Sequence, residues 1–144
     1  MITGMNHTGF VVKDLDRSVE FYREVMGFEL VRLVERNGGP ISQVVGYEDT
    51  HLSLGGDHML ELVEYRKLAS SDRPTQERAV LGAGHLAFDV DDIEETYRDL
   101  TSRGCVAMNP PARLAPDRAA CYMQDPDGNC IELIESGEPL SKDA

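Results

Sequence analysis

Residues 7–15 of the chain read HTGFVVKDL, and residues 85–93 read HLAFDVDDI. The two stretches align without a gap, and His, Phe, Val and Asp coincide in them. Self-similarity at a fixed spacing is typical of a structural unit that occurs more than once in a chain. We therefore expect the chain to fold as two copies of one module.

Each stretch is followed by apolar residues three or four positions apart, a spacing that places them on one face of a helix. The apolar positions are Leu15, Val19, Tyr22 and Met26 in the first copy, and Ile93, Tyr97 and Leu100 in the second. Asp14 and Asp92 are suited to cap the starts of these helices, and Gly27 and Gly104 are suited to end them. The pattern predicts one helix in each copy.

Each copy closes with a matching strand, since residues 59–64 (MLELVE) resemble residues 130–135 (CIELIE). Two more strands are expected between helix and closing strand in each copy, at about residues 29–35, 43–54, 106–109 and 118–124. The sequence DPDGN at 125–129 is typical of a tight turn. Each copy therefore reads as strand–helix–strand–strand–strand, or βαβββ.

The predicted fold class is α+β, with two tandem βαβββ modules in one domain spanning residues 1–135. Module one covers 1–66, a polar linker covers 67–82, and module two covers 83–135. The three prolines within residues 109–116 predict an extended loop there. Residues 136–144 are expected to form a C-terminal tail.

The composition limits the function. The chain has 144 residues with 26 acidic and 14 basic side chains, a net charge of −12. Such a chain repels a phosphate backbone or an anionic lipid surface, so nucleic acid and membrane are not expected partners. No apolar run reaches the ~20 residues of a membrane span, and the first residues lack the pattern of a signal peptide. The three cysteines form no CxxC pair, which is typical of reduced thiols in a cytoplasmic protein.

Four polar side chains recur at matched places in the two copies: His7, Glu61, His85 and Glu132. In each strand the neighbouring apolar residues point to the opposite face, towards the helix. One such His is more often a structural residue, and one such Glu more often faces water. The repetition of both types favours a metal site, because imidazole and carboxylate together suit Zn, Ni, Co, Mn or Fe.

These stretches resemble the vicinal oxygen chelate superfamily, which includes glyoxalase I, methylmalonyl-CoA epimerase, extradiol dioxygenases and bleomycin-binding proteins. The resemblance covers about residues 5–135 and is carried by 7–15, by FY through MGF at 21–28, by GHLAF at 84–88 and by DPDGNCIEL at 125–133. It implies two βαβββ modules that form a curved mixed sheet around one divalent metal ion. It also implies a homodimer that acts on a small-molecule substrate.

Carried over by motif, the implied metal ligands are His7, Glu61, His85 and Glu132. This set is similar to that of bacterial glyoxalase I and close to that of methylmalonyl-CoA epimerase. The resemblance implies a lyase or an isomerase that stabilises an enediolate or enolate, with Glu132 as the base and Glu61 as the second candidate. The alternatives are an Fe(II)-dependent extradiol-type dioxygenase and a non-catalytic drug- or metabolite-binding resistance protein.

Two positions depart from the glyoxalase I pattern. Val11 stands where the family has an arginine, and Tyr65 stands where it has an asparagine, both of which help to hold glutathione. These two positions leave open a substrate other than a glutathione adduct. Cys130 shares the strand face of Glu132 and could line a pocket, although a packed thiol is the favoured reading. Arg113 could bind a substrate anion, although a solvated side chain is the commoner case.

Overall fold

The computed structural model describes residues 1–2, 4–35, 47–53, 58–65 and 77–137. The chain divides into two compact units, Met1–Pro74 and Thr75–Ala144. The boundary falls inside the linker predicted at 67–82. No helix among the described residues has the length and apolar character needed to cross a bilayer.

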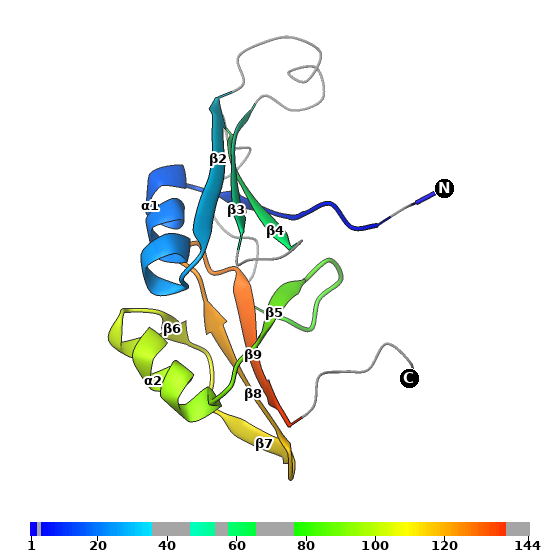
Figure 1. Cartoon of the computed structure of the whole chain (residues 1–144), viewed down its shortest axis with the longest axis vertical. Coiled ribbons are helices and arrows are strands. Elements are labelled where there is room, and N and C mark those ends of the chain that lie inside the picture. Colours follow the sequence, from blue (N-terminus) through cyan, green and yellow to red (C-terminus); the bar gives the residue numbers. More distant parts are fainter. Residues whose placement is uncertain (3, 36–46, 54–57, 66–76, 138–144) are drawn as a thin grey trace. The chain divides into compact units, whose positions relative to one another are not determined.

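The described residues of the first unit form one mixed four-stranded sheet and one helical segment. Its elements are β1 (Thr8–Val12), α1 (Leu15–Glu20), η1 (Phe21–Val25), β2 (Glu29–Glu35), β3 (Tyr47–Ser53) and β4 (Met59–Tyr65). The strand order is β1-β4-β3-β2, with β1 parallel to β4 and the other pairs antiparallel (Figure 1). The predicted order of strand, helix and three strands is confirmed for this unit.

The helical segment of the first unit begins and ends where the sequence predicts. The Asp14 side chain accepts a hydrogen bond from the backbone N–H of Arg17, and Gly27 follows the last turn with a φ of +77°. Tyr22 is fully buried and meets the Phe28 ring edge to face, with centroids 5.4 Å apart. The apolar face of the segment therefore packs into the core of its unit.

The second unit repeats this arrangement with one added strand. Its elements are β5 (His85–Asp89), α2 (Ile93–Ser102), β6 (Val106–Ala107), β7 (Ala112–Ala115), β8 (Arg118–Gln124) and β9 (Cys130–Ser136). The strand order is β5-β9-β8-β6, and β7 also pairs with β8. As in the first unit, the first strand runs parallel to the last.

The prediction for the proline-rich segment 109–116 is partly wrong. Ala112–Ala115 form β7, and the predicted strand 106–109 is reduced to β6 at Val106–Ala107. Both short strands pair with β8, at its opposite ends. The gap between them lies at Pro110 and Pro111, because proline has no N–H to donate to a neighbouring strand.

The turn at residues 125–129 fixes where β9 begins. The buried Asp125 carboxylate accepts hydrogen bonds from the backbone N–H of Asp127 and Asn129 and from the Asn129 side chain, at 2.7–2.9 Å. Gly128 has a φ of +79°, a conformation that glycine adopts without strain. The turn thereby sets the register of the β8–β9 hairpin, which carries Glu132.

Candidate functional site

The first predicted pair of ligands meets in the first unit. The parallel pairing of β1 and β4 sets Gly9 opposite Glu61, and His7 is two residues before Gly9, on the same face of the strand. Nε2 of His7 lies 3.1 Å from Oε2 of Glu61, with side chains 36% and 14% exposed. The carboxylate is thus largely buried, while the imidazole is open on one side.

The second predicted pair meets in the second unit with the same geometry. β5 and β9 set Ala87 opposite Glu132, and His85 is two residues before Ala87. Nε2 of His85 lies 3.0 Å from Oε2 of Glu132, with side chains 45% and 16% exposed. The sequence repeat is therefore also a repeat of side-chain geometry.

Both separations suit two ligands of one ion as well as a direct ion pair. Two ligand atoms that each lie about 2.0–2.2 Å from an ion, at a right angle to each other, are about 3 Å apart. Nδ1 of His7 lies 2.7 Å from Oδ1 of Asn6. If Nδ1–H donates to that oxygen, the neutral ring presents a lone pair to Glu61. Two acceptors at this distance repel each other unless a proton or a metal ion lies between them.

The four predicted ligands are brought together two by two. His7 and Glu61 belong to one unit, and His85 and Glu132 belong to the other. Within the described ranges, no group of three or more His, Cys, Asp or Glu side chains is arranged to hold a metal ion.

Tyr122 completes the surroundings of the second pair, and the sequence analysis missed it. It stands opposite Glu132 in the β8–β9 register, and its ring meets the His85 ring edge to face, with centroids 5.5 Å apart. Burial raises the pKa of Tyr122, and a hydrogen bond to the Glu132 carboxylate raises it further. Tyr122 therefore stays protonated and donates to Glu132.

His85 of the second pair lines a cavity of about 490 Å³. Its lining consists of Glu77, Arg78, Ala79, Ala83, Gly84, His85, Tyr122 and Cys130. Cys130 is buried, as the favoured prediction of a packed thiol has it, and it also contributes to the wall. Arg78 lies over the Tyr122 ring, with Cζ 4.0 Å from the ring centroid.

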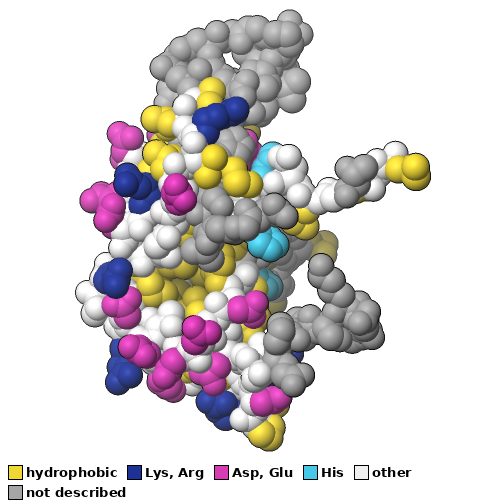
Figure 2. All heavy atoms as spheres, viewed as in Figure 1, with side chains coloured by type: hydrophobic (Ala, Val, Ile, Leu, Met, Phe, Trp, Pro, Cys, Tyr) yellow, Lys and Arg dark blue, Asp and Glu magenta, His cyan; other side chains and the backbone are white. Residues whose placement is uncertain are grey.

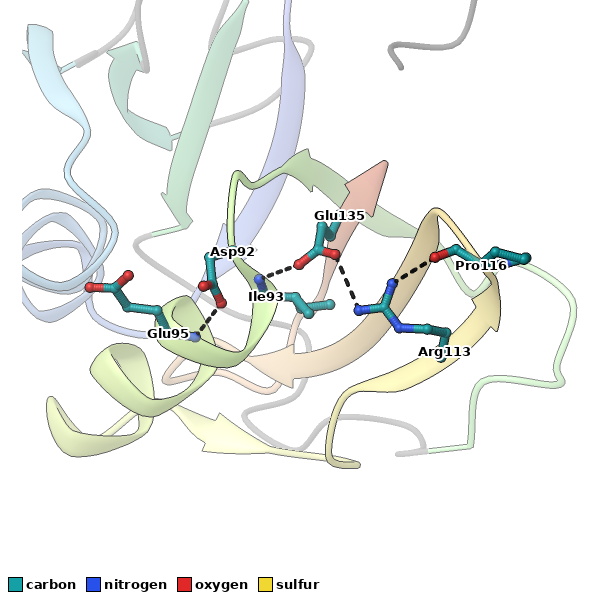
Figure 3. A network of polar contacts seen from close by, with 6 residues as sticks. All are labelled: Asp92, Ile93, Glu95, Arg113, Pro116 and Glu135. Atoms are coloured by element: carbon teal, nitrogen blue, oxygen red, sulfur yellow. Dashed lines mark hydrogen bonds and ion pairs between the residues drawn. The ribbon is translucent and has the colours of Figure 1, made fainter. Parts of the chain in front are cut away.

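Two further glutamates tie the ligand-bearing strands to the helices, and the sequence analysis assigned them no role. Oε2 of Glu64 accepts the backbone N–H of Leu15 at 2.7 Å, and Oε2 of Glu135 accepts that of Ile93 at 2.9 Å (Figure 3). Each is the third residue after a predicted ligand, Glu61 or Glu132. Their recurrence in the repeat was the signal that could have identified them.

Arg113 has a structural partner. Nη2 of Arg113 lies 3.3 Å from Oε1 of Glu135, and its Nη1 donates to the backbone oxygen of Pro116 (Figure 3). The guanidinium thus links β7 to β9. This contact accounts for Arg113 without a substrate anion.

Comparison with known proteins places the chain in a family. The family model described as Glyoxalase/Bleomycin resistance protein/Dioxygenase superfamily matches residues 4–133. The chain is 32% identical over 132 residues to a probable lactoylglutathione lyase from Vibrio cholerae, a match that covers 90% of the chain and 88% of that protein. It is 33% identical over 132 residues to the lactoylglutathione lyase of Haemophilus influenzae, covering 90% of each.

A solved structure supports the same relationship. The glyoxalase family protein from Enterococcus faecalis is 27% identical, with a TM-score of 0.70 over 92% of this chain and 97% of that one. The α+β fold and the family predicted from the sequence are confirmed. The chain belongs to the glyoxalase/bleomycin resistance protein/dioxygenase superfamily.

Proposed function

We propose that this protein is a divalent-metal-dependent lyase or isomerase of the glyoxalase type, with His7, Glu61, His85 and Glu132 as metal ligands. The observation that carries the proposal is the matched pair of His–Glu contacts, Nε2 to Oε2 at 3.1 and 3.0 Å. A duplicated fold needs no polar side chains at these positions, and a largely buried carboxylate is costly without a cationic partner. The similarity to proteins named lactoylglutathione lyase supports the reaction class.

The donor set limits the metal. Neutral imidazole nitrogen and carboxylate oxygen suit Zn, Ni, Co, Mn or Fe(II) rather than calcium, which takes oxygen ligands alone. Such an ion, when bound, would stabilise negative charge on two neighbouring substrate oxygens. The Nε2–Oε2 separations of 3.1 and 3.0 Å are those expected of two ligands on one such ion.

The two carboxylates would transfer the proton, and Tyr122 would orient one of them. Glu132 would accept a proton from the carbon next to a substrate carbonyl, and Glu61 would be the second carboxylate able to return it. Tyr122 would orient Glu132 through its hydroxyl, since it opposes that residue across the hairpin. Two carboxylates suit isomerisation and epimerisation as well as the lyase reaction.

The substrate we propose is a small oxygenated compound, such as a 2-oxo or 2-hydroxy acid derivative or a thioester, rather than a glutathione adduct. Val11 lies on the strand face of His7 and is 51% exposed, where glyoxalase I has an arginine. Tyr65, at the end of β4, replaces the asparagine. Neither side chain supplies the charge or amide that holds glutathione in that family.

Metal content and proton exchange test the proposal. We expect the purified full-length protein to retain a divalent ion by elemental analysis, with one ion per chain if both pairs share it and two if each pair binds its own. In D2O, the loaded protein should exchange the proton next to the carbonyl of a 2-oxo acid or thioester, followed by NMR. Protein that neither retains nor binds Zn, Ni, Co, Mn or Fe would contradict the proposal and favour a metal-free binding protein.

Substitution of the ligands provides the control. His85→Ala should lower metal affinity at least about tenfold, because it removes a ligand. Glu95→Gln, on the exposed start of α2, removes the charge of one acidic side chain away from both pairs and should leave the affinity unchanged. Equal losses in both variants would attribute binding to the overall charge instead.

A further inference from the structure

We infer that the cavity beside His85 and Glu132 binds the carboxylate of a small monoanionic substrate through Arg78, which the Tyr122 ring holds in place. The inference deepens the proposed function, on which it rests, by naming the substrate class. The cavity lies wholly within the second unit, since all its lining residues belong to Thr75–Ala144.

Arg78 lies close to the His85–Glu132 pair. Its guanidinium and the His85 ring line the same cavity. The Tyr122 ring connects them, because it meets His85 edge to face at 5.5 Å and carries Arg78 at 4.0 Å. A substrate that reaches the His85–Glu132 pair therefore has a cation beside it.

The Tyr122 ring restrains the guanidinium of Arg78, whose Cζ lies 4.0 Å from the ring centroid. A guanidinium that lies over an aromatic face keeps its N–H donors at its edges, where they match the two oxygens of a carboxylate. The Tyr122 ring is itself held, since it packs edge to face against the His85 ring, with centroids 5.5 Å apart. Less side-chain entropy is lost when a restrained arginine binds a ligand.

The charges around the cavity favour a monoanion. Glu77 also lines the cavity, but its carboxylate accepts backbone N–H groups of its own turn, with Oε1 3.0 Å from N of Ala79. Across the described residues, no carboxylate lies within ion-pair distance of Arg78. One guanidinium balances one negative charge, whereas a dianionic phosphate would add repulsion from Glu77 and Glu132. This favours a carboxylate over a phosphate.

The size of the cavity favours a small ligand. A volume of about 490 Å³ is within the range of small-molecule sites. Apart from its charged groups, the wall consists of small residues, two aromatic rings and a thiol. Such a cavity suits a small acid with a compact apolar part.

The experiment compares an acid with its neutral amide. Titration calorimetry on the full-length protein, zinc-loaded and metal-free, measures the affinity for mandelate and for mandelamide. We expect wild type to prefer the acid roughly tenfold or more, the range of a charge-assisted hydrogen bond. In metal-free Arg78→Gln protein this preference should fall to near one, while the affinity for the amide stays unchanged.

The controls separate charge, ring and hydroxyl. Arg103→Gln removes an exposed arginine paired with Asp99 on α2 and should keep the preference. Tyr122→Phe keeps the aromatic ring and should also keep the preference for the acid. In Tyr122→Leu the preference should fall several-fold, and adding Arg78→Gln should then cause little further loss.

The binding experiment can fail independently of the proposed function. An acid preference that is unchanged in Arg78→Gln would overturn the inference, and so would tighter binding of inorganic phosphate than of mandelate. Metal retention measured on the same samples tests the proposed function independently. A protein that retains metal but shows no Arg78-dependent preference contradicts the inference alone.

Discussion

Glu132 differs from most acidic residues of the chain because it sits in the middle of a strand, 16% exposed, with a histidine nitrogen at 3.0 Å. Glu61 has the same surroundings in the first unit. At the level of single residues, therefore, the proposed chemistry concentrates on these two carboxylates. Their roles can be separated by substitutions that keep their shape.

Glu132→Gln is expected to abolish turnover without unfolding the protein. Glutamine is nearly isosteric but cannot accept the proton, and loss of a general base costs about 10²–10⁴-fold in rate. Proton exchange in D2O measures the loss, and circular dichroism checks the fold. Undiminished exchange in this variant would exclude Glu132 as the base and leave Glu61 as the candidate.

Tyr122→Phe is expected to lower kcat by about tenfold with little change in KM. The ring and its contacts with His85 and Arg78 stay, but Glu132 loses the hydroxyl that orients it. Loss of a partner behind a ligand typically costs 10–100-fold in affinity or activity. The zinc affinity of the same variant is the second readout. Wild-type values of both kcat and zinc affinity would exclude a positioning role for the Tyr122 hydroxyl.

Tyr122 and Arg78 show why the sequence predicts a ligand set more easily than its surroundings. The ligands recur at matched positions and can be found by aligning the chain with itself. Tyr122 becomes a candidate only after the turn at 125–129 is used to pair β8 with β9. Arg78 lies in the predicted linker, where no periodicity exists, and its contact with the ring depends on the path of the chain.

At the level of elements, each helix start is tied to the strand that bears a ligand. Asp92 caps α2 by accepting the N–H of Glu95 at 2.8 Å, and Glu135 accepts that of Ile93 from β9. Glu64 makes the equivalent contact at the start of α1. The carboxylates satisfy N–H groups that have no partner within the helix and face the positive end of its dipole.

Glu135→Ala is expected to lower the free energy of unfolding by about 1 kcal/mol, a typical cost for losing a capping side chain. The Arg113 contact is lost with it, but an exposed ion pair adds little. Urea denaturation measures the change, with Glu94→Ala on the exposed side of α2 as the matched control. If both variants lose the same stability, the contact with Ile93 contributes nothing of its own.

The elements themselves were largely predictable, with β7 as the exception. Helices from Leu15 and Ile93, and strands such as Arg118–Gln124, follow from apolar spacing, caps and turns. Ala112–Ala115 is too short and too close to prolines to show a strand pattern. It pairs because β8 offers a free edge, a condition set by the sheet rather than by these residues.

At the level of the whole molecule, charge is distributed unevenly. Acidic side chains gather over α2 in Figure 2. Several of them surround a hollow of about 590 Å³, lined by Asp89, Val90, Asp91, Asp92, Glu95, Thr96, Asp99 and Arg103. These groups are exposed, unlike Glu61 and Glu132. These exposed acidic groups contribute to the net charge of −12, and surface charge of one sign favours solubility.

Because of its buried thiols, the protein should lose stability as the pH becomes alkaline. Burial raises the pKa of Cys105 and of Cys121 from 9.0 to about 11. Below pH 9 both states of the protein hold neutral thiols, and stability is fully retained. Between about pH 9 and 11 the unfolded chain releases these protons and the folded chain keeps them, so unfolding becomes more favourable. The loss is up to about 1.4 kcal/mol per pH unit for each thiol.

Cys121→Ala tests this pH dependence. Other groups also titrate in the window, so the measured quantity is the slope of unfolding free energy against pH, from urea denaturation between pH 8.5 and about 11. The alanine variant starts from lower stability because it leaves a small cavity. Its curve should nevertheless fall less steeply than wild type, by up to about 1.4 kcal/mol per pH unit. Parallel curves would mean that the Cys121 thiol ionises equally in the folded and unfolded states, which its full burial in β8 opposes.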